Sequence, residues 1–108
     1  MKHRLDLYAK RLTLSTDGDI LSTNSEAVRQ QLFDLLESEP IKHANWETLE
    51  LDLKSAKMID SAGLNLIVAV IQHIKQRGCK LTATISSPEI QRTFLFTRLD
   101  RQLDLVLV

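Results

Sequence analysis

The chain has 108 residues, 44% of them hydrophobic, and its 14 lysines and arginines balance its 14 aspartates and glutamates. This size fits one domain, residues 1–108, and the scattered basic residues exclude the basic patch of a nucleic-acid-binding protein, so we expect no direct contact with DNA or RNA. No apolar run approaches the roughly 20 residues of a membrane helix, and the N-terminus lacks the apolar core of a signal peptide. We therefore expect a cytoplasmic protein with no membrane insertion.

The first 40 residues predict two strands and a helix. Leucines alternate with polar neighbours in two short runs, which predicts two strands joined near residues 9 and 10. After a turn signal at residues 17–19, apolar residues recur at helical spacing from about residue 24 to 37. The expected cap of this helix is Asn24 or Thr23, and Pro40 lies where a proline stops helical continuation. The leucines of the two strands are Leu5, Leu7, Leu12 and Leu14.

A strand and the longest helix are predicted in the middle of the chain. Residues 46–53 alternate between apolar and polar side chains, which predicts a strand with one face in water. Residues 61–77 carry an apolar stripe at helical spacing, and Gly78 supplies a C-terminal stop. This is the most apolar of the predicted helices.

The C-terminal third completes an α/β pattern. Residues 81–85 predict a strand, Ser87 and Pro88 open a helix as capping serine and first-turn proline, and residues 103–108 predict a closing strand. Strands interleaved with helices predict an α/β fold with a mixed, mostly parallel sheet of four or five strands and helices mainly on one face. We expect the other face to be polar and to carry Glu50, Asp52, Thr82 and Thr84.

The stretch Met58-Ile59-Asp60-Ser61-Ala62-Gly63-Leu64 joins the middle strand to the longest helix and is the candidate site. A helix start presents unpaired backbone N–H groups and a partial positive charge, so Ser61 is well placed to carry a phosphate. Serine is also a common N-cap, and Asp60 could serve as a cap or pair with the helix dipole. Capping and phosphate acceptance by Ser61 are compatible.

Catalysis has little support in the sequence. Ser61 lacks the flanking glycines of a nucleophile elbow, and His73, twelve residues along the same helix, would lie about 18 Å away. Cys79 is the only cysteine, and the three histidines show no metal-ligand spacing. The three glycines never approach the pattern of a phosphate-binding loop. We therefore expect no enzyme activity, metal or cofactor, although a serine-directed covalent probe would test a small hydrolase that uses Ser61.

The motif Asp60-Ser61-Ala62-Gly63-Leu64 after an aliphatic strand resembles the signature of STAS domains, the anti-anti-sigma factor family. The segment Gly18-Asp19-Ile20-Leu21 before the first helix resembles the family's Gly-x-Leu-Asp segment, and the order of elements agrees over nearly the whole chain. The family's aspartate in that segment falls at Leu21 here. Ala62 stands where many members carry a second serine or threonine, which leaves Ser61 as the one obvious hydroxyl acceptor in the loop.

The resemblance implies an anti-sigma factor antagonist. Its unmodified form would bind an anti-sigma kinase of the histidine-kinase-like ATPase fold and free a sigma factor, and phosphorylation of Ser61 would release the complex. A PP2C-type phosphatase is a possible further partner. The alternative is a STAS scaffold, or the STAS subunit of a lipid-transport complex, that works without phosphorylation. The candidate partner-binding residues are Asp19, Asp60, Ser61, Ala62, Gly63 and Leu64.

Gly63 is an unusual residue for the first turn of a helix, because glycine costs about 1 kcal/mol there relative to alanine. Its presence indicates a steric demand. That demand is either close packing inside the domain or access for a kinase, and we favour access.

Overall fold

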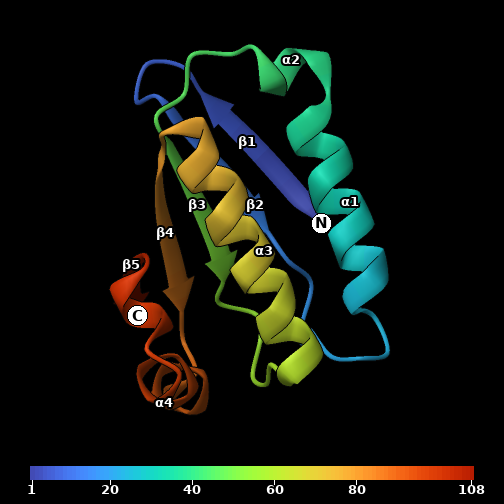
Figure 1. Ribbon diagram of the computed structural model, residues 1–108, viewed down its shortest axis with the longest axis vertical. Coiled ribbons are helices and arrows are strands. Elements are labelled where there is room, and N and C mark those ends of the chain that lie inside the picture. The colour runs from blue at the N-terminus through green and yellow to red at the C-terminus, as the bar shows by residue number, and fades with distance from the viewer.

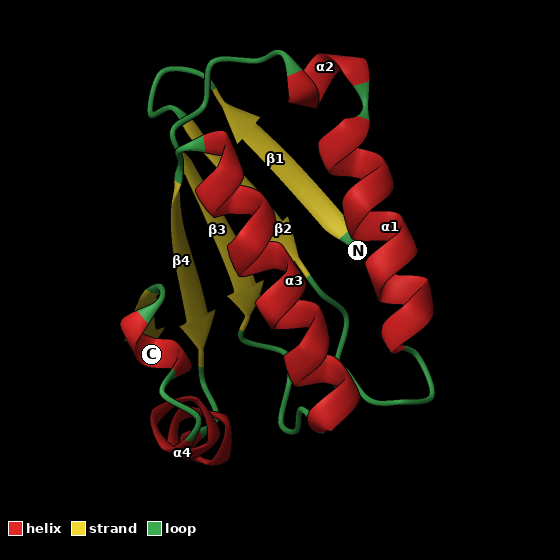
Figure 2. Ribbon diagram, viewed as in Figure 1, coloured by secondary structure: helices red, strands yellow, loops and turns green.

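The computed structural model describes residues 1–108 and places a five-stranded sheet behind a layer of helices (Figure 1, Figure 2). The strands lie in the order β1-β2-β3-β4-β5. β1 and β2 form an antiparallel hairpin, and all other neighbours are parallel, so the predicted mixed, mostly parallel sheet is confirmed. The strands are β1 (Lys2–Asp6), β2 (Arg11–Ser15), β3 (Thr48–Leu53), β4 (Lys80–Ile85) and β5 (Asp104–Leu107).

The helices cover mainly one face of the sheet, as predicted. α1 and α3 lie side by side in front of the strands, and α4 lies at the end of the sheet where α3 begins (Figure 1). None of the helices combines the length and the apolar character needed to cross a membrane. They are α1 (Ser25–Glu37), α2 (Glu39–Lys42), α3 (Ser61–Arg77) and α4 (Pro88–Phe96), with a 3-10 turn, η1, at Leu99–Arg101.

Local signals set both ends of α3, and the helix predicted over residues 61–77 is confirmed. At its start, the carboxylate of Asp60 accepts a hydrogen bond from the N–H of Gly63. At its end, Gly78 adopts a left-handed conformation with φ 77°, and its N–H donates to the carbonyls of Ile74 and Lys75. The side of α3 that faces the sheet is buried through Gly63, Leu66, Ile67, Val70, Ile71 and Ile74.

The alternation of the central strands separates an apolar face from a polar one. The polar face is confirmed by the register, which pairs Glu50 with Thr82 and Asp52 with Thr84. On that face Glu50 accepts hydrogen bonds from the guanidinium of Arg11 at 2.8 Å and the hydroxyl of Thr84 at 3.1 Å, and so links three strands. The face that packs on the helices is built from Leu12, Leu14, Leu49, Leu51, Leu53, Leu81, Ala83 and Ile85.

Three details of the predicted elements are wrong. Leu7 lies beyond the end of β1 and is 58% exposed, because the Asp6 carboxylate accepts a hydrogen bond from the N–H of Ala9 and turns the chain one residue earlier. The chain does leave α1 at Glu37, but Pro40 then lies in the first turn of the short helix α2, where a missing N–H costs nothing. The middle strand begins at Thr48 rather than residue 46.

Candidate functional site

Two loops meet at the start of α3. The loop from β2 to α1 and the loop from β3 to α3 run side by side, and Ile20 forms an isolated parallel bridge with Ile59. The N–H of Ile20 donates to the carbonyl of Met58 at 3.4 Å, and the N–H of Asp60 donates to the carbonyl of Ile20 at 3.3 Å. The Gly18–Leu21 segment and the Asp60–Leu64 motif, 42 residues apart at their first residues, therefore belong to one site.

Asp60 joins the two loops and caps α3. One carboxylate oxygen accepts from the N–H of Gly63 at 3.0 Å, and the other accepts from the N–H of Ser22 at 2.7 Å. Hydrogen bonds from the Gly63 and Ser22 amides to the charged form hold the pKa of the Asp60 carboxyl below its ordinary value. The Asp60 side chain is therefore a negatively charged group of the site, and its two hydrogen bonds fix its orientation.

Asp19 makes the reciprocal connection. Its Oδ1 accepts hydrogen bonds from the N–H groups of Lys57 at 2.8 Å and Met58 at 3.1 Å, so its side chain positions the loop that precedes α3. Asn24 is the N-cap residue of α1 but makes no side-chain cap bond. Its side chain instead donates to the carbonyl of Asp19 and accepts from the N–H of Leu21, both at 2.8 Å, and so stabilises the loop before the helix.

Ser61 is the exposed first residue of α3. The sequence allowed Ser61 to be the N-cap, but the N-cap of α3 is Asp60. The bridge between Ile20 and Ile59 ends directly before Asp60, so the helix begins at Ser61. The Ser61 hydroxyl is therefore available at a helix N-terminus, where the backbone favours negative charge.

Gly63 is required for close packing inside the domain. The interpretation that it gives access to a kinase is wrong. The residue is buried, and a Cβ built on it would lie 2.4 Å from the carbonyl oxygen of Ile20 and 2.6 Å from Cγ2 of Ile59. Contacts this short do not occur, so only glycine lets α3 pack against the neighbouring loop. Ala62 and Leu64 are half-buried, and Leu64 packs against the core, which leaves Ser61 as the exposed residue of the motif Asp60–Leu64.

The run of α3 that follows Asp60 is free of charge, a feature that the motif alone did not indicate. From its start, α3 carries no lysine, arginine, aspartate or glutamate before Lys75, although 26% of the chain is charged. This absence of charge over four turns was the available sequence signal. Interface centres are depleted of charged residues, so this face suits a protein partner. The exposed residues near Ser61 are Ser22, Thr23, Lys57, Met58, Asn65 and Val68, and the charges beside this face are Lys57 and the half-buried Asp60.

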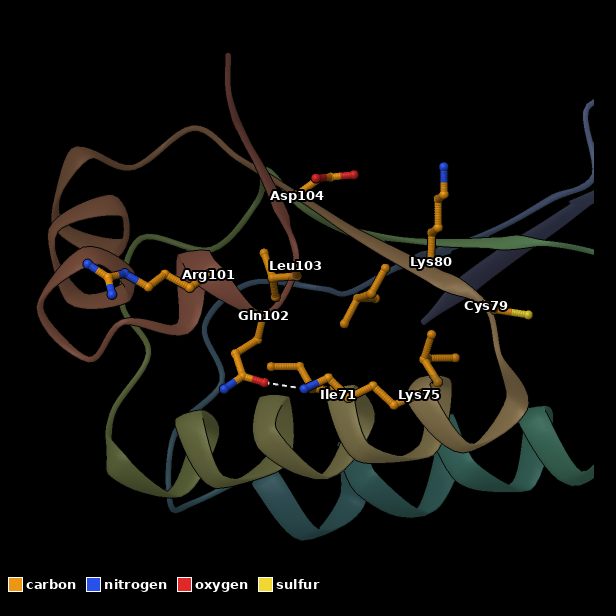
Figure 3. A pocket seen from close by; sticks show the side chains of 10 residues that line it. Ile71, Lys75, Cys79, Lys80, Arg101, Gln102, Leu103 and Asp104 are labelled. Atoms are coloured by element: carbon orange, nitrogen blue, oxygen red, sulfur yellow. Dashed lines mark hydrogen bonds between the residues drawn. The ribbon is translucent and has the colours of Figure 1, made fainter.

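The largest cavity, about 450 Å³, lies away from Ser61, between the C-terminal half of α3, the start of β4 and the segment from η1 to β5 (Figure 3). Lys75 extends toward Gln102 and donates a hydrogen bond to it, whereas Arg101 points away from the cavity. Residues 60–64 line neither this cavity nor the other three. The candidate site is therefore an open surface.

We expect an Asp60→Ala variant to be less stable than the wild type at pH 7, and the difference to shrink as the pH falls below about 4. The folded-state pKa of Asp60 is lowered, so its stabilisation is present above the unfolded-state pKa and is lost as the pH falls through the folded-state value. Urea unfolding of both proteins at pH 7 and pH 3 measures this. An equal stability difference at both pH values would contradict the role of the Asp60 charge.

Comparison with known proteins identifies the fold. The family model for the STAS domain matches residues 3–107. A putative anti-sigma factor antagonist from Thermotoga maritima, TM1081, superposes with a TM-score of 0.81 at 20% identity, covering 99% of this chain and 86% of that one. An anti-sigma factor antagonist from Mycobacterium paratuberculosis gives 0.75 at 18%, covering 99% and 86%. The antagonist SpoIIAA in its unphosphorylated form gives 0.60 at 14%, covering 93% and 96%.

Proposed function

Because the chain belongs to the STAS domain family, we propose that it is an anti-sigma factor antagonist that is switched by phosphorylation of Ser61. The unphosphorylated form binds an anti-sigma kinase of the histidine-kinase-like ATPase fold and frees the sigma factor. Phosphorylation of Ser61 releases the complex. The observation that carries this proposal is an exposed serine at the N-terminus of α3 whose cap is supplied by its neighbour Asp60.

The geometry lets the domain accept a phosphate without unfolding. The helix N-terminus stabilises a negative charge by roughly 0.3–1 kcal/mol, which acts against the repulsion from the Asp60 carboxylate. The cap and loop hydrogen bonds are made by the carboxylates of Asp60 and Asp19, so a modified Ser61 hydroxyl breaks none of them. The fold of the phosphorylated protein therefore stays close to that of the free one.

A docked complex responds differently. The phosphate adds about −1.5 to −2 charges at pH 7 at the start of the uncharged run of α3, next to the carboxylate of Asp60. A partner that covers this face with an apolar or acidic patch would leave the phosphate buried and unpaired, and the cost of an unpaired buried charge far exceeds the stabilisation by the helix terminus. The modification therefore acts on the complex and not on the domain.

The structural neighbours support this proposal at the level of the fold. SpoIIAA, described as an anti-sigma factor antagonist, has been solved in a phosphorylated form as well, and that form superposes on this chain with a TM-score of 0.64 at 13% identity, covering 97% of this chain and 91% of that one. A fold of this kind thus accommodates both states in that protein.

The deciding experiment is mass spectrometry of the protein after incubation with ATP and the cognate kinase. We expect one phosphate, on Ser61, and none on a Ser61→Ala variant. Ser22 and Thr23 are exposed hydroxyls on the same surface and act as internal controls. Modification of either one in place of Ser61 would overturn the assignment. A PP2C-type phosphatase is expected to remove the phosphate and to restore binding.

The second candidate is a constitutive STAS module, either a signalling scaffold or the subunit of a lipid-transport complex. It is favoured by Leu21, which stands where the family carries an aspartate and so removes one carboxylate from the proposed kinase contact. Such a module would use the same uncharged face of α3 without phosphorylation. A pull-down from native cells separates the two, because an ABC-transporter ATPase and a sigma-factor regulator are easily told apart.

A further inference from the structure

The two edge strands of the sheet, β1 and β5, differ in the charge of their exposed side chains. The β1 edge carries Lys2, His3 and Arg4, which are all exposed, and charged side chains of this kind keep an edge strand from pairing with another chain. The β5 edge begins at Asp104 and continues as four apolar residues, of which Val106 and Leu107 are each 43% exposed. Figure 1 shows β5 beyond β4, at the side of the molecule opposite β1.

From this contrast we propose that the free edge of β5 is a self-association surface on which a second copy of this chain adds its own β5 in antiparallel orientation. The surface is separate from the Ser61 site, and the proposal is independent of the proposed function. An exposed, uncharged edge strand presents unpaired N–H and C=O groups as a template for another strand.

The backbone of β5 shows which groups are free. The N–H of Val108 donates to the carbonyl of Ile85 at 2.9 Å, so residue 108 is directed toward β4. Successive residues of an extended strand alternate in direction, and the parallel register pairs Leu107 with Ile85 and Leu105 with Ala83. The amides and carbonyls of Leu105 and Leu107 therefore point to the free edge.

These outward groups define one symmetric register. When Val106 of one copy lies opposite Val106 of the other, Leu105 faces Leu107 of the second copy and the reverse, which forms roughly four backbone hydrogen bonds. Asp104 then lies opposite Val108, so the two Asp104 side chains do not meet. The arrangement is a twofold one, and it closes at a dimer instead of continuing into a filament.

The charge pattern selects a second β5 as the occupant. Pairing of β5 with a β1 edge would place Lys2, His3 and Arg4 against apolar side chains, and it would leave a free β5 edge on one of the two molecules, so the assembly would not close at a dimer. A second β5 instead supplies a strand of the same length whose residues after Asp104 are all apolar. Because so short a strand buries less than the roughly 1,200 Å² of stable interfaces, we expect association only at about 10 µM to 1 mM.

Sedimentation equilibrium of the full chain tests the proposal. We expect the average mass of the wild type to rise toward that of a dimer over this concentration range. A Leu107→Pro variant is expected to remain monomeric, because proline removes an outward N–H and leaves the Val108 hydrogen bond to β4 in place. A Phe96→Ser variant is the control for non-specific apolar contact: Phe96 is 90% exposed on α4, and its loss is expected to leave dimerisation unchanged.

A charge exchange at residue 106 tests the register without a proline. The side chain of Val106 lies on the polar face, since the residue pairs with Thr84 and is exposed, so both variants are expected to fold. Val106→Lys and Val106→Glu are each expected to be monomeric, and an equimolar mixture is expected to form a heterodimer. A wild type that stays monomeric at 1 mM, a Leu107→Pro variant that dimerises, or a mixture that stays monomeric would each overturn the proposal.

Discussion

A Ser61→Asp variant is expected to bind the anti-sigma kinase at least about 100-fold more weakly than the wild type, while Ser61→Ala binds within a few-fold of it. The aspartate places a further negative charge at the exposed start of α3, between the Asp60 carboxylate and the uncharged run of the helix. A buried or like-charge mismatch at an interface costs several kcal/mol, and about 2.7 kcal/mol corresponds to 100-fold in affinity. Isothermal titration calorimetry with the purified kinase measures both variants.

The same variants separate an effect on binding from an effect on folding. A negative charge near a helix N-terminus is mildly favourable, so the free energy of unfolding of Ser61→Asp is expected to stay within about 0.5 kcal/mol of the wild type. Gln31→Asp introduces the same charge at an exposed position of α1 and is expected to leave affinity unchanged. Wild-type affinity in the Ser61→Asp variant would rule out an electrostatic switch at this position.

The ends of α3 and the polar face of the sheet could be predicted from the sequence, because residues close together in the chain determine them. Both ends of α3 follow from capping residues within a few positions of the helix, and the polar face of the sheet follows from alternation along single strands. The helix start is a boundary case, because Asp60 and Ser61 are both good N-caps and stand side by side. Which of them caps the helix depends on the bridge between Ile20 and Ile59, a contact between distant segments.

What the sequence did not predict depends on contacts across the chain. The carboxylate of Asp19 bonds to the amides of Lys57 and Met58, and nothing in the residues around Asp19 indicates that. Pro40 shows the limit of local signals in another way, since proline both ends one helix and suits the first turn of the next. The steric demand at Gly63 was visible in the sequence, but the atom that imposes it, the carbonyl oxygen of Ile20, was not.

A Gly63→Ala variant is expected to lose about 3 kcal/mol or more of its free energy of unfolding and to melt at least about 10 °C lower than the wild type. The added methyl group would stand 2.4 Å from the Ile20 carbonyl oxygen, which is backbone and cannot rotate away, so α3 and the loop must move apart. Circular dichroism melts and urea unfolding measure the loss.

Gly78→Ala is the matched control, because it adds the same methyl group at the other end of the same helix. No atom lies within 4 Å of a Cβ at Gly78, so this variant suffers only the strain of a left-handed φ of 77° and is expected to lose about 1 kcal/mol. Equal losses in the two variants would mean that glycine serves only backbone freedom at both positions. A much larger loss at Gly63 would show that α3 must approach the Ile20 carbonyl closely. This close approach also lets the Asp60 carboxylate accept the hydrogen bond from the Ser22 amide, and it keeps the two loops around Ser61 in one surface.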